Sequence, residues 1–153
     1  MHTTRLDHVT LRTTRLAATR DFFVEVAGLR VGARPPFRFP GFWLYDETGP
    51  AVHLAGPAVD ASLERYLGAR PASAAVGAGA VDHIAFRGSG RAAFEQRLRA
   101  LNVHFESRTV PELGEHQLFV QDPNGITVEF IFAVDEAQHG ERAQPASVAN
   151  AQS

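Results

Sequence analysis

Two residue types, cysteine and lysine, are missing from the sequence altogether. Without cysteine the chain has no disulfide, no thiolate nucleophile and no zinc ribbon. Because all 15 basic residues are arginine, Schiff-base chemistry and the lysine of a phosphate-binding loop are excluded as well. The motifs GxSxG and GxGxxG do not occur either. Chemistry is therefore left to histidine, the carboxylates, arginine, tyrosine and a bound metal ion.

The charge is balanced, and long apolar runs are absent. With 15 basic against 17 acidic residues, the chain has no excess of positive charge for binding phosphates, so we expect no nucleic-acid partner. No apolar run approaches the roughly 20 residues of a membrane span, and the N-terminal MHTTRLDHVTLRTTRL lacks the apolar centre of a signal peptide. We expect no membrane partner and a cytoplasmic location. A chain of 153 residues with 44% apolar residues is one globular domain, or two small modules that share a core.

A short pattern occurs twice. The segment LDHVTLRT at 6–13 is followed, 75 residues later, by VDHIAFRG at 81–88, with both histidines and both arginines in register. After the first copy, Thr14 is the expected N-cap of a helix that ends at Gly28. After the second, Ser89 is the expected cap of a helix that ends at Asn102. Each copy thus predicts a strand followed by a helix.

The segments after the two predicted helices also match. FWLYDETGPAVHL, from Phe42, aligns with LFVQDPNGITVEF, from Leu118, and this places the Asp-x-x-Gly turns 76 residues apart. Such a turn reverses two alternating strands, because Asp accepts hydrogen bonds from its own backbone and Gly adopts positive φ. With LRVGARP and VHFESRTV as further strands, each half reads β-α-β-β-β.

The repeat defines the domain organisation. We expect an α+β fold with one domain at 5–133, made of modules at 5–56 and 80–133. The linker at 57–79 is predicted to hold a short helix behind Asp60, and 134–153 reads as a polar C-terminal tail. No chemistry is assigned to the linker or to the tail.

Strand alternation indicates which side chains share a face. His8 and Arg12 point the same way along the first strand, and His83 and Arg87 do so in the second copy. The hairpin alignment sets Glu129 opposite His53, again 76 residues apart. A single strand histidine is more often a surface residue than a ligand. Four ligand-type residues in equivalent positions favour a metal site.

If the modules pack about a pseudo-twofold axis, His8, His53, His83 and Glu129 converge in one cleft. Three imidazoles and one carboxylate suit one divalent transition metal, Fe, Ni, Zn, Mn or Co, rather than calcium. The residues leave open whether the modules pair within one chain or between two chains. They also leave open whether His53 is a ligand or a near neighbour of the ion.

The segments LDHVTL, AVHL, VDHIAF and DPNGITVEF resemble the vicinal oxygen chelate superfamily. This family includes glyoxalase I, methylmalonyl-CoA epimerase, extradiol dioxygenases and fosfomycin-resistance proteins. The resemblance implies paired βαβββ modules that form a half-open barrel around a metal cleft, with ligands at the four positions above. It also implies an enzyme with a small-molecule substrate, a homodimer, and Glu129 as both ligand and catalytic base.

The resemblance leaves the reaction open. Bacterial glyoxalase I has a carboxylate where this chain has His53. Extradiol dioxygenases use two histidines and one glutamate, which matches His8, His83 and Glu129, but most are about twice as long. We favour proton transfer of the glyoxalase type (isomerase or lyase), because the short chain lacks clear candidates for a dioxygenase's acid and base. The alternatives are an Fe(II)-dependent extradiol-type dioxygenase and a non-catalytic small-molecule binding protein.

Aromatic residues concentrate in PPFRFPGFWLY at 35–45, where Phe37 and Phe39 between prolines suggest a rim or lid. These rings either fill the barrel core or form a wall for a flat or apolar substrate. The two arginines of the repeat either bind a substrate carboxylate or form structural ion pairs. The candidate substrate-binding residues are Trp43, Phe119, Gln117, Arg12 and Arg87.

Overall fold

The structure is a computed structural model, and it describes residues 6–69 and 77–134. Apart from Val134, the predicted C-terminal tail lies outside the described residues, as does the part of the linker at 70–76. None of the described helices is long and apolar enough to cross a bilayer.

The first module is a four-stranded sheet with one helix. Its elements are β1 (Val9–Arg12), α1 (Leu16–Glu25), β2 (Arg30–Gly32), β3 (Gly41–Tyr45) and β4 (Pro50–Ala55). The strand order is β1-β4-β3-β2, with β1 parallel to β4 and the other pairs antiparallel. Residues of β4 alternate, so that Val52 and Leu54 are buried while His53 points to the opposite face.

The second module repeats this arrangement. Its elements are β5 (His83–Arg87), α3 (Arg91–Ala100), β6 (Phe105–Val110), η2 (Pro111–Leu113), β7 (Glu115–Gln121) and β8 (Thr127–Ala133). The order β5-β8-β7-β6 has the same parallel and antiparallel pairings as the first sheet. The prediction of two βαβββ modules in an α+β fold is confirmed.

The two hairpin turns are closed by aspartate side chains, as the sequence predicted. Asp46 Oδ1 accepts hydrogen bonds from the backbone N–H groups of Thr48 (2.7 Å) and Gly49 (3.0 Å). Asp122 Oδ1 accepts from the N–H groups of Asn124 and Ile126, both at 2.8 Å. Each carboxylate therefore closes its own turn.

Both predicted helix caps are wrong by one residue. The N-cap of α1 is Arg15 rather than Thr14, and no side chain caps the helix, although the Thr13 hydroxyl accepts a hydrogen bond from the N–H of Arg15 (2.9 Å). The second helix starts after Gly90, whose φ of 73° is left-handed. This turn lies between Ser89 and the helix, so Ser89 is one position too early to be the N-cap.

One apolar core extends through both modules. Phe23 of α1 and Leu98 of α3 are fully buried in it, together with side chains from both sheets. Across the module boundary the rings of Phe23 and Phe86 pack edge to face, with centroids 6.4 Å apart. The two halves therefore share a single hydrophobic interior.

Polar contacts also join the modules. The Thr13 hydroxyl donates to Asn124 Oδ1 (2.6 Å), and Asn124 Nδ2 donates to the Thr19 hydroxyl (3.0 Å). Arg15 donates to the backbone oxygen of Pro123 (2.6 Å). Start and end of the domain are thus connected through the second hairpin turn.

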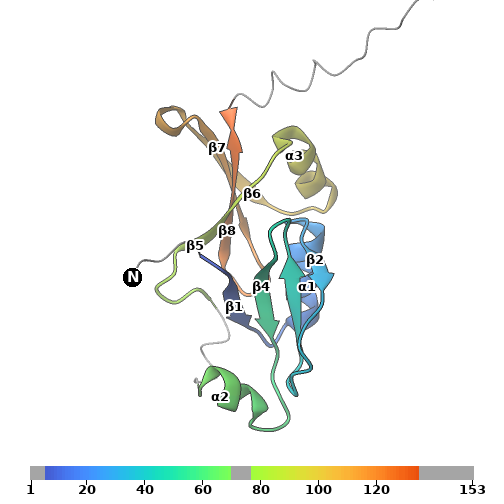
Figure 1. Ribbon diagram of the computed structural model, residues 1–153. Coiled ribbons are helices and arrows are strands. Elements are labelled where there is room, and N and C mark those ends of the chain that lie inside the picture. The colour runs from blue at the N-terminus through green and yellow to red at the C-terminus, as the bar shows by residue number, and fades with distance from the viewer. Residues whose placement is uncertain (1–5, 70–76, 135–153) are drawn as a thin grey trace, which may run out of the picture.

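Figure 1 shows the second module, yellow to red, lying above the first, blue to green, with α1 and α3 on the same side of their sheets. The two sheets are not closed onto each other, which is consistent with a half-open barrel. A further helix, α2 (Ser62–Leu67), lies at the lower end of the first module, as predicted behind Asp60. Asp60 Oδ1 accepts a hydrogen bond from the N–H of Ser62 (2.8 Å), and the Arg12 guanidinium donates to the oxygen of Gly68 (2.7 Å).

Candidate functional site

The first candidate pair is His8 and His53, which lie on the face of the first sheet away from α1. Thr10 is the register partner of His53, so His8, two residues earlier, is its diagonal neighbour. The imidazoles stack with centroids 3.9 Å apart, and Trp43 stacks on the other face of His53 at 4.1 Å. Trp43 is the register partner of His53 in the neighbouring strand, so the two side chains lie on the same face of the sheet, as the sequence predicted.

The second pair is His83 and Glu129, in the equivalent positions of the second sheet. Glu129 pairs with Ala85 across the parallel ladder, which makes His83 its diagonal neighbour. His83 Nε2 lies 2.9 Å from Glu129 Oε2, and Glu129 is only 4% exposed. Adjacent ligands of one octahedral ion, with bonds of about 2.1 Å, are about 3 Å apart. This pair therefore has a separation that suits two ligands of one ion.

Each strand histidine is oriented by the aspartate that precedes it. His8 Nδ1 lies 2.7 Å from Asp7 Oδ2, and His83 Nδ1 lies 2.7 Å from Asp82 Oδ1. A carboxylate that accepts the Nδ1 proton leaves Nε2 as the electron-pair donor, which is the usual arrangement behind metal-binding histidines. Asp7 and Asp82 were not predicted to be functional residues, although the repeated Asp-His dipeptide was the available signal.

His53 has a buried nitrogen without a partner. Its Nε2 is shielded from solvent and makes no hydrogen bond to any described residue. Burial lowers the pKa of His53, and the neighbouring His8 lowers it further. A neutral imidazole with an unshared electron pair is the form in which histidine binds metals. The chemistry of all four residues thus fits a borderline divalent ion.

The four residues do not form one cluster within the chain. Among residues 6–69 and 77–134, no group of three or more histidine, cysteine, aspartate or glutamate side chains is close enough to hold a metal. His8 and His53 form one pair, and His83 and Glu129 form the other. The sequence left open whether the modules pair within one chain or between two chains. Within this chain the four residues stay in two separate pairs, because the shared core places the modules one above the other rather than face to face.

The remaining predicted site residues are mostly occupied by structural contacts. Arg87 forms an ion pair with Glu115 (2.8 Å), and Gln117 donates to the same carboxylate (3.2 Å) while accepting from Arg108 (2.6 Å). Arg12 is bonded to the end of α2. Phe119 lies edge-on to His83, with centroids 6.3 Å apart, and shares the face of Glu129.

A cavity of about 270 Å³ opens beside the first pair. It is lined by His8, His53 and Trp43, and by Phe37 and Phe39 of the predicted aromatic rim. Arg34 and Tyr66, which were not predicted to bind substrate, line it as well. Burial lowers the pKa of Arg34, an effect that Tyr66 partly offsets. Tyr66 belongs to α2, so the linker to which we assigned no chemistry supplies part of this wall.

The comparisons with known proteins agree on one fold. The sequence model of the glyoxalase/bleomycin resistance protein/dioxygenase superfamily matches residues 5–130. The sequence matches none of the curated proteins with which it was compared. Solved structures with the same fold include a lactoylglutathione lyase from Agrobacterium tumefaciens, with 19% identity and a TM-score of 0.62 over 86% of this chain and 95% of that one.

Two further structures show the same similarity. A glyoxylase/bleomycin resistance protein/dioxygenase domain from a Frankia species has 16% identity and a TM-score of 0.62, over 86% of this chain and 99% of that one. The genomically encoded fosfomycin resistance protein of Listeria monocytogenes has 16% identity and a TM-score of 0.58, over 86% and 95%. At these identities the likeness concerns the fold alone.

Proposed function

The chain belongs to the glyoxalase/bleomycin resistance protein/dioxygenase superfamily, and from this premise we propose that it is a divalent-metal-dependent enzyme. Its reaction is the transfer of a proton on a small substrate that carries two neighbouring oxygens, as in an isomerase or lyase of the glyoxalase type. The observation that carries the proposal is the state of the histidine nitrogens. In both Asp-His pairs the carboxylate holds Nδ1, and His53 has a buried Nε2 without a partner.

His8, His53, His83 and Glu129 would hold the ion. A divalent ion in this position would withdraw electron density from the substrate oxygens and so acidify the adjacent C–H bond. Glu129 is the base: a carboxylate oxygen accepts the proton from carbon and returns it to the neighbouring carbon. His83 Nε2 lies 2.9 Å from this carboxylate, so the two groups would be neighbouring ligands of the ion. His53 stays neutral, since its lowered pKa disfavours the imidazolium form.

We further propose that the site is completed in a homodimer. The two pairs lie apart in one chain, and each is on a sheet face that is not covered by α1 or α3. In a twofold dimer the His8–His53 face of one copy can meet the His83–Glu129 face of the other, and symmetry then produces two identical sites. Each site would contain three histidines and one glutamate, the donor set that a single chain does not assemble.

Mixing two variants that each lack one ligand tests the metal site and its completion in a dimer together. His8→Ala removes a ligand from the first pair and His83→Ala removes one from the second, so each homodimer alone should bind Co(II) weakly. If the sites form between chains, a mixed dimer contains one site without both ligands and one intact site. After unfolding and refolding together, about a quarter of the wild-type Co(II) sites should reappear, because half of the dimers are mixed and each has one intact site.

The control is a mixture of His8→Ala with His53→Ala. Both substitutions affect the same pair, so this mixture should not restore any Co(II) sites. If the His8→Ala and His83→Ala mixture also restores nothing while wild-type protein binds Co(II), the site does not form between chains. If wild-type protein binds no Co(II), Ni(II) or Zn(II), the metal proposal is wrong.

The reaction type is tested on protein loaded with Fe(II), Ni(II) or Zn(II) in turn and offered hemithioacetals and catechols. Proton transfer predicts that solvent deuterium enters the product with Ni(II) or Zn(II), and that Glu129→Gln abolishes this exchange. Oxygen uptake that occurs only with Fe(II) would instead identify a dioxygenase, for which two histidines and one carboxylate are the usual ligands.

A further inference from the structure

The cavity beside His53 combines a cation with an aromatic wall. Arg34 lies 4.9 Å from the centroids of both Phe37 and Phe39, which stack on each other at 5.2 Å. Tyr66 lies 4.5 Å from Phe37, and these rings continue toward Trp43 and its stacked partner His53. A ligand in this cavity would therefore lie between rings at one end and the candidate metal ligands at the other.

Arg34 has spare hydrogen-bonding capacity in this cavity. Its guanidinium donates to the backbone oxygen of Phe39 (2.8 Å), one bond for a group with five N–H donors. No carboxylate among residues 6–69 and 77–134 forms an ion pair with it. Asp7, the acidic residue of the cavity lining, lies at the other end in contact with His8.

A glycine in the neighbouring strand β3 leaves room for this guanidinium. A Cβ at Gly41 would lie 3.2 Å from both Nε and Nη2 of Arg34, and it would collide with the backbone oxygen of Leu54. Glycine at this strand position therefore leaves the space in which the arginine lies beside the sheet. Phe39, whose backbone oxygen accepts the Arg34 hydrogen bond, also packs with Leu63 of α2 in a small apolar cluster.

The size of the cavity limits its occupant. An apolar cavity of about 150 Å³ accommodates benzene. About 270 Å³ therefore accommodates one ring with a short substituent, and excludes full burial of a large peptide-like molecule. A planar carboxylate matches the guanidinium fork, and a flat ring matches the stacked side chains.

We propose that this cavity binds an aryl or arylalkyl carboxylate, with the acid group on Arg34 and the ring against Phe37 and Trp43. This specifies the substrate class of the site. It depends on the proposed function only in that the rest of the ligand extends toward His8 and His53. Binding of the acid and ring themselves requires no metal.

The test uses metal-free protein and three probes. Trp43 is the only tryptophan of the chain and lines the cavity, so its fluorescence reports occupancy directly. We expect 3-phenylpropionate to bind about ten- to a hundredfold more tightly than its neutral amide, which lacks the charge that pairs with Arg34. Propionate, which lacks the ring, should bind more weakly than either.

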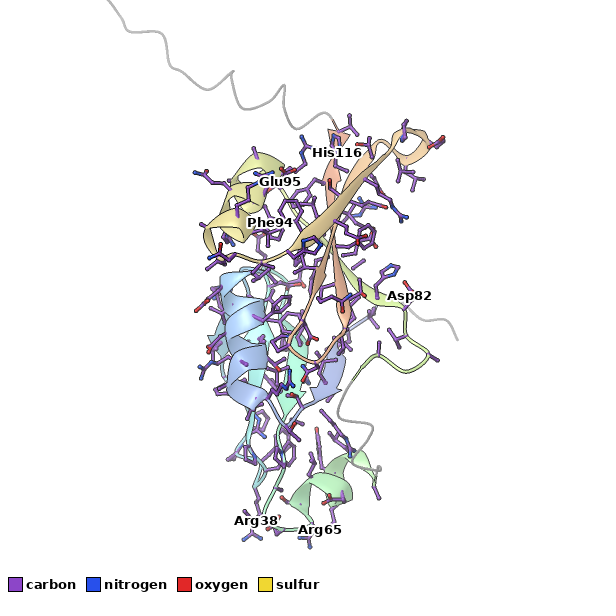
Figure 2. All side chains as sticks on the ribbon, turned by 180° about the vertical axis from the view of Figure 1, so that it is seen from behind. Arg38, Arg65, Asp82, Phe94, Glu95 and His116 are labelled. Atoms are coloured by element: carbon purple, nitrogen blue, oxygen red, sulfur yellow. The ribbon has the colours of Figure 1, made fainter. Side chains whose placement is uncertain are left out.

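Variants assign the preference to Arg34. Arg34→Gln should reduce the affinity for the acid to that for the amide while leaving amide binding nearly unchanged, and Arg34→Lys should restore part of the preference. Arg38→Gln is the matched control. Arg38 is exposed on the same segment, and Figure 2 shows it at the outer tip beside Arg65, away from the sheets. This variant should bind like wild type.

Equal affinity for acid and amide in the wild type would overturn the proposal. So would an Arg34→Gln variant that loses both ligands equally without any recovery in Arg34→Lys. These outcomes are separate from the fate of the metal proposal, since Co(II) binding is measured without the probes and probe binding without metal. A protein that binds Co(II) but shows no preference for the acid keeps the proposed function and loses this substrate class.

Discussion

Asn124 connects the two modules, and its replacement by alanine should be unusually costly for a turn residue. The amide makes three side-chain hydrogen bonds, to Thr13, Thr19 and Asp122, at 2.6, 3.0 and 2.8 Å. Asn124 is 6% exposed, and the two threonines are 2% and 0% exposed, so water cannot easily replace the lost partners. Two neutral bonds and one to a carboxylate are together worth about 3 to 5 kcal/mol.

The assay is urea unfolding followed by circular dichroism, with the m-value expected to stay constant. The loss corresponds to a decrease in Tm of roughly 6 to 20 °C for a domain of this size. Asn124→Asp should be worse than Asn124→Ala, because it keeps an acceptor for Thr13 but places a second carboxylate beside Asp122 Oδ2. Gln121→Ala in the same hairpin is the control, since Gln121 is exposed and its side-chain amide donates to the Thr127 hydroxyl (2.8 Å).

We expect Gln121→Ala to change the free energy of unfolding by no more than about 0.5 kcal/mol. If Asn124→Ala costs no more than this control, the buried amide contributes nothing to the connection between the modules. The reasoning would also be wrong if Asn124→Asp proved more stable than Asn124→Ala at neutral pH.

Other consequences can be checked independently. Phe23→Ala should lower the free energy of unfolding by about 3 to 5 kcal/mol in the same urea assay, because the ring is fully buried where the modules meet. Asp82→Ala should weaken Co(II) binding about 10- to 100-fold in a spectroscopic titration while the fold persists, because Asp82 orients His83; unchanged affinity would remove it from the site. Hydrogen bonds from Ser62 lower the pKa of Asp60 below 3.8, so its stabilising effect is complete above that pH and is lost as the pH falls through the lowered value. Asp60→Ala should therefore reduce stability at pH near 7, and the difference in urea midpoint from wild type should shrink as the pH falls below about 3.8.

The local features of the fold were readable from the sequence because they depend on neighbouring residues. The Asp-x-x-Gly turns form where expected, since each aspartate bonds to backbone groups two to four residues away. The faces of His53 and Glu129 follow from the two-residue period of a strand. The start of the first helix was misplaced because the preceding Thr13 is held by a buried contact to Asn124, 111 residues away, which no local pattern reveals. The start of the second was misplaced because Gly90 inserts a left-handed turn after Ser89.

The sequence by itself determined the duplicated modules, their element order and the two pairs of candidate ligands, because these follow from short-range periodicity and from the 75- and 76-residue offsets. Only the tertiary structure decided that the pairs remain apart in one chain and that Arg34 and α2 form an aromatic cavity beside one of them. The physical reason is that module placement depends on contacts between distant segments, such as Phe23 with Phe86 and Thr13 with Asn124. Such contacts are set by the packing of the shared core and are not encoded in the repeat of either module.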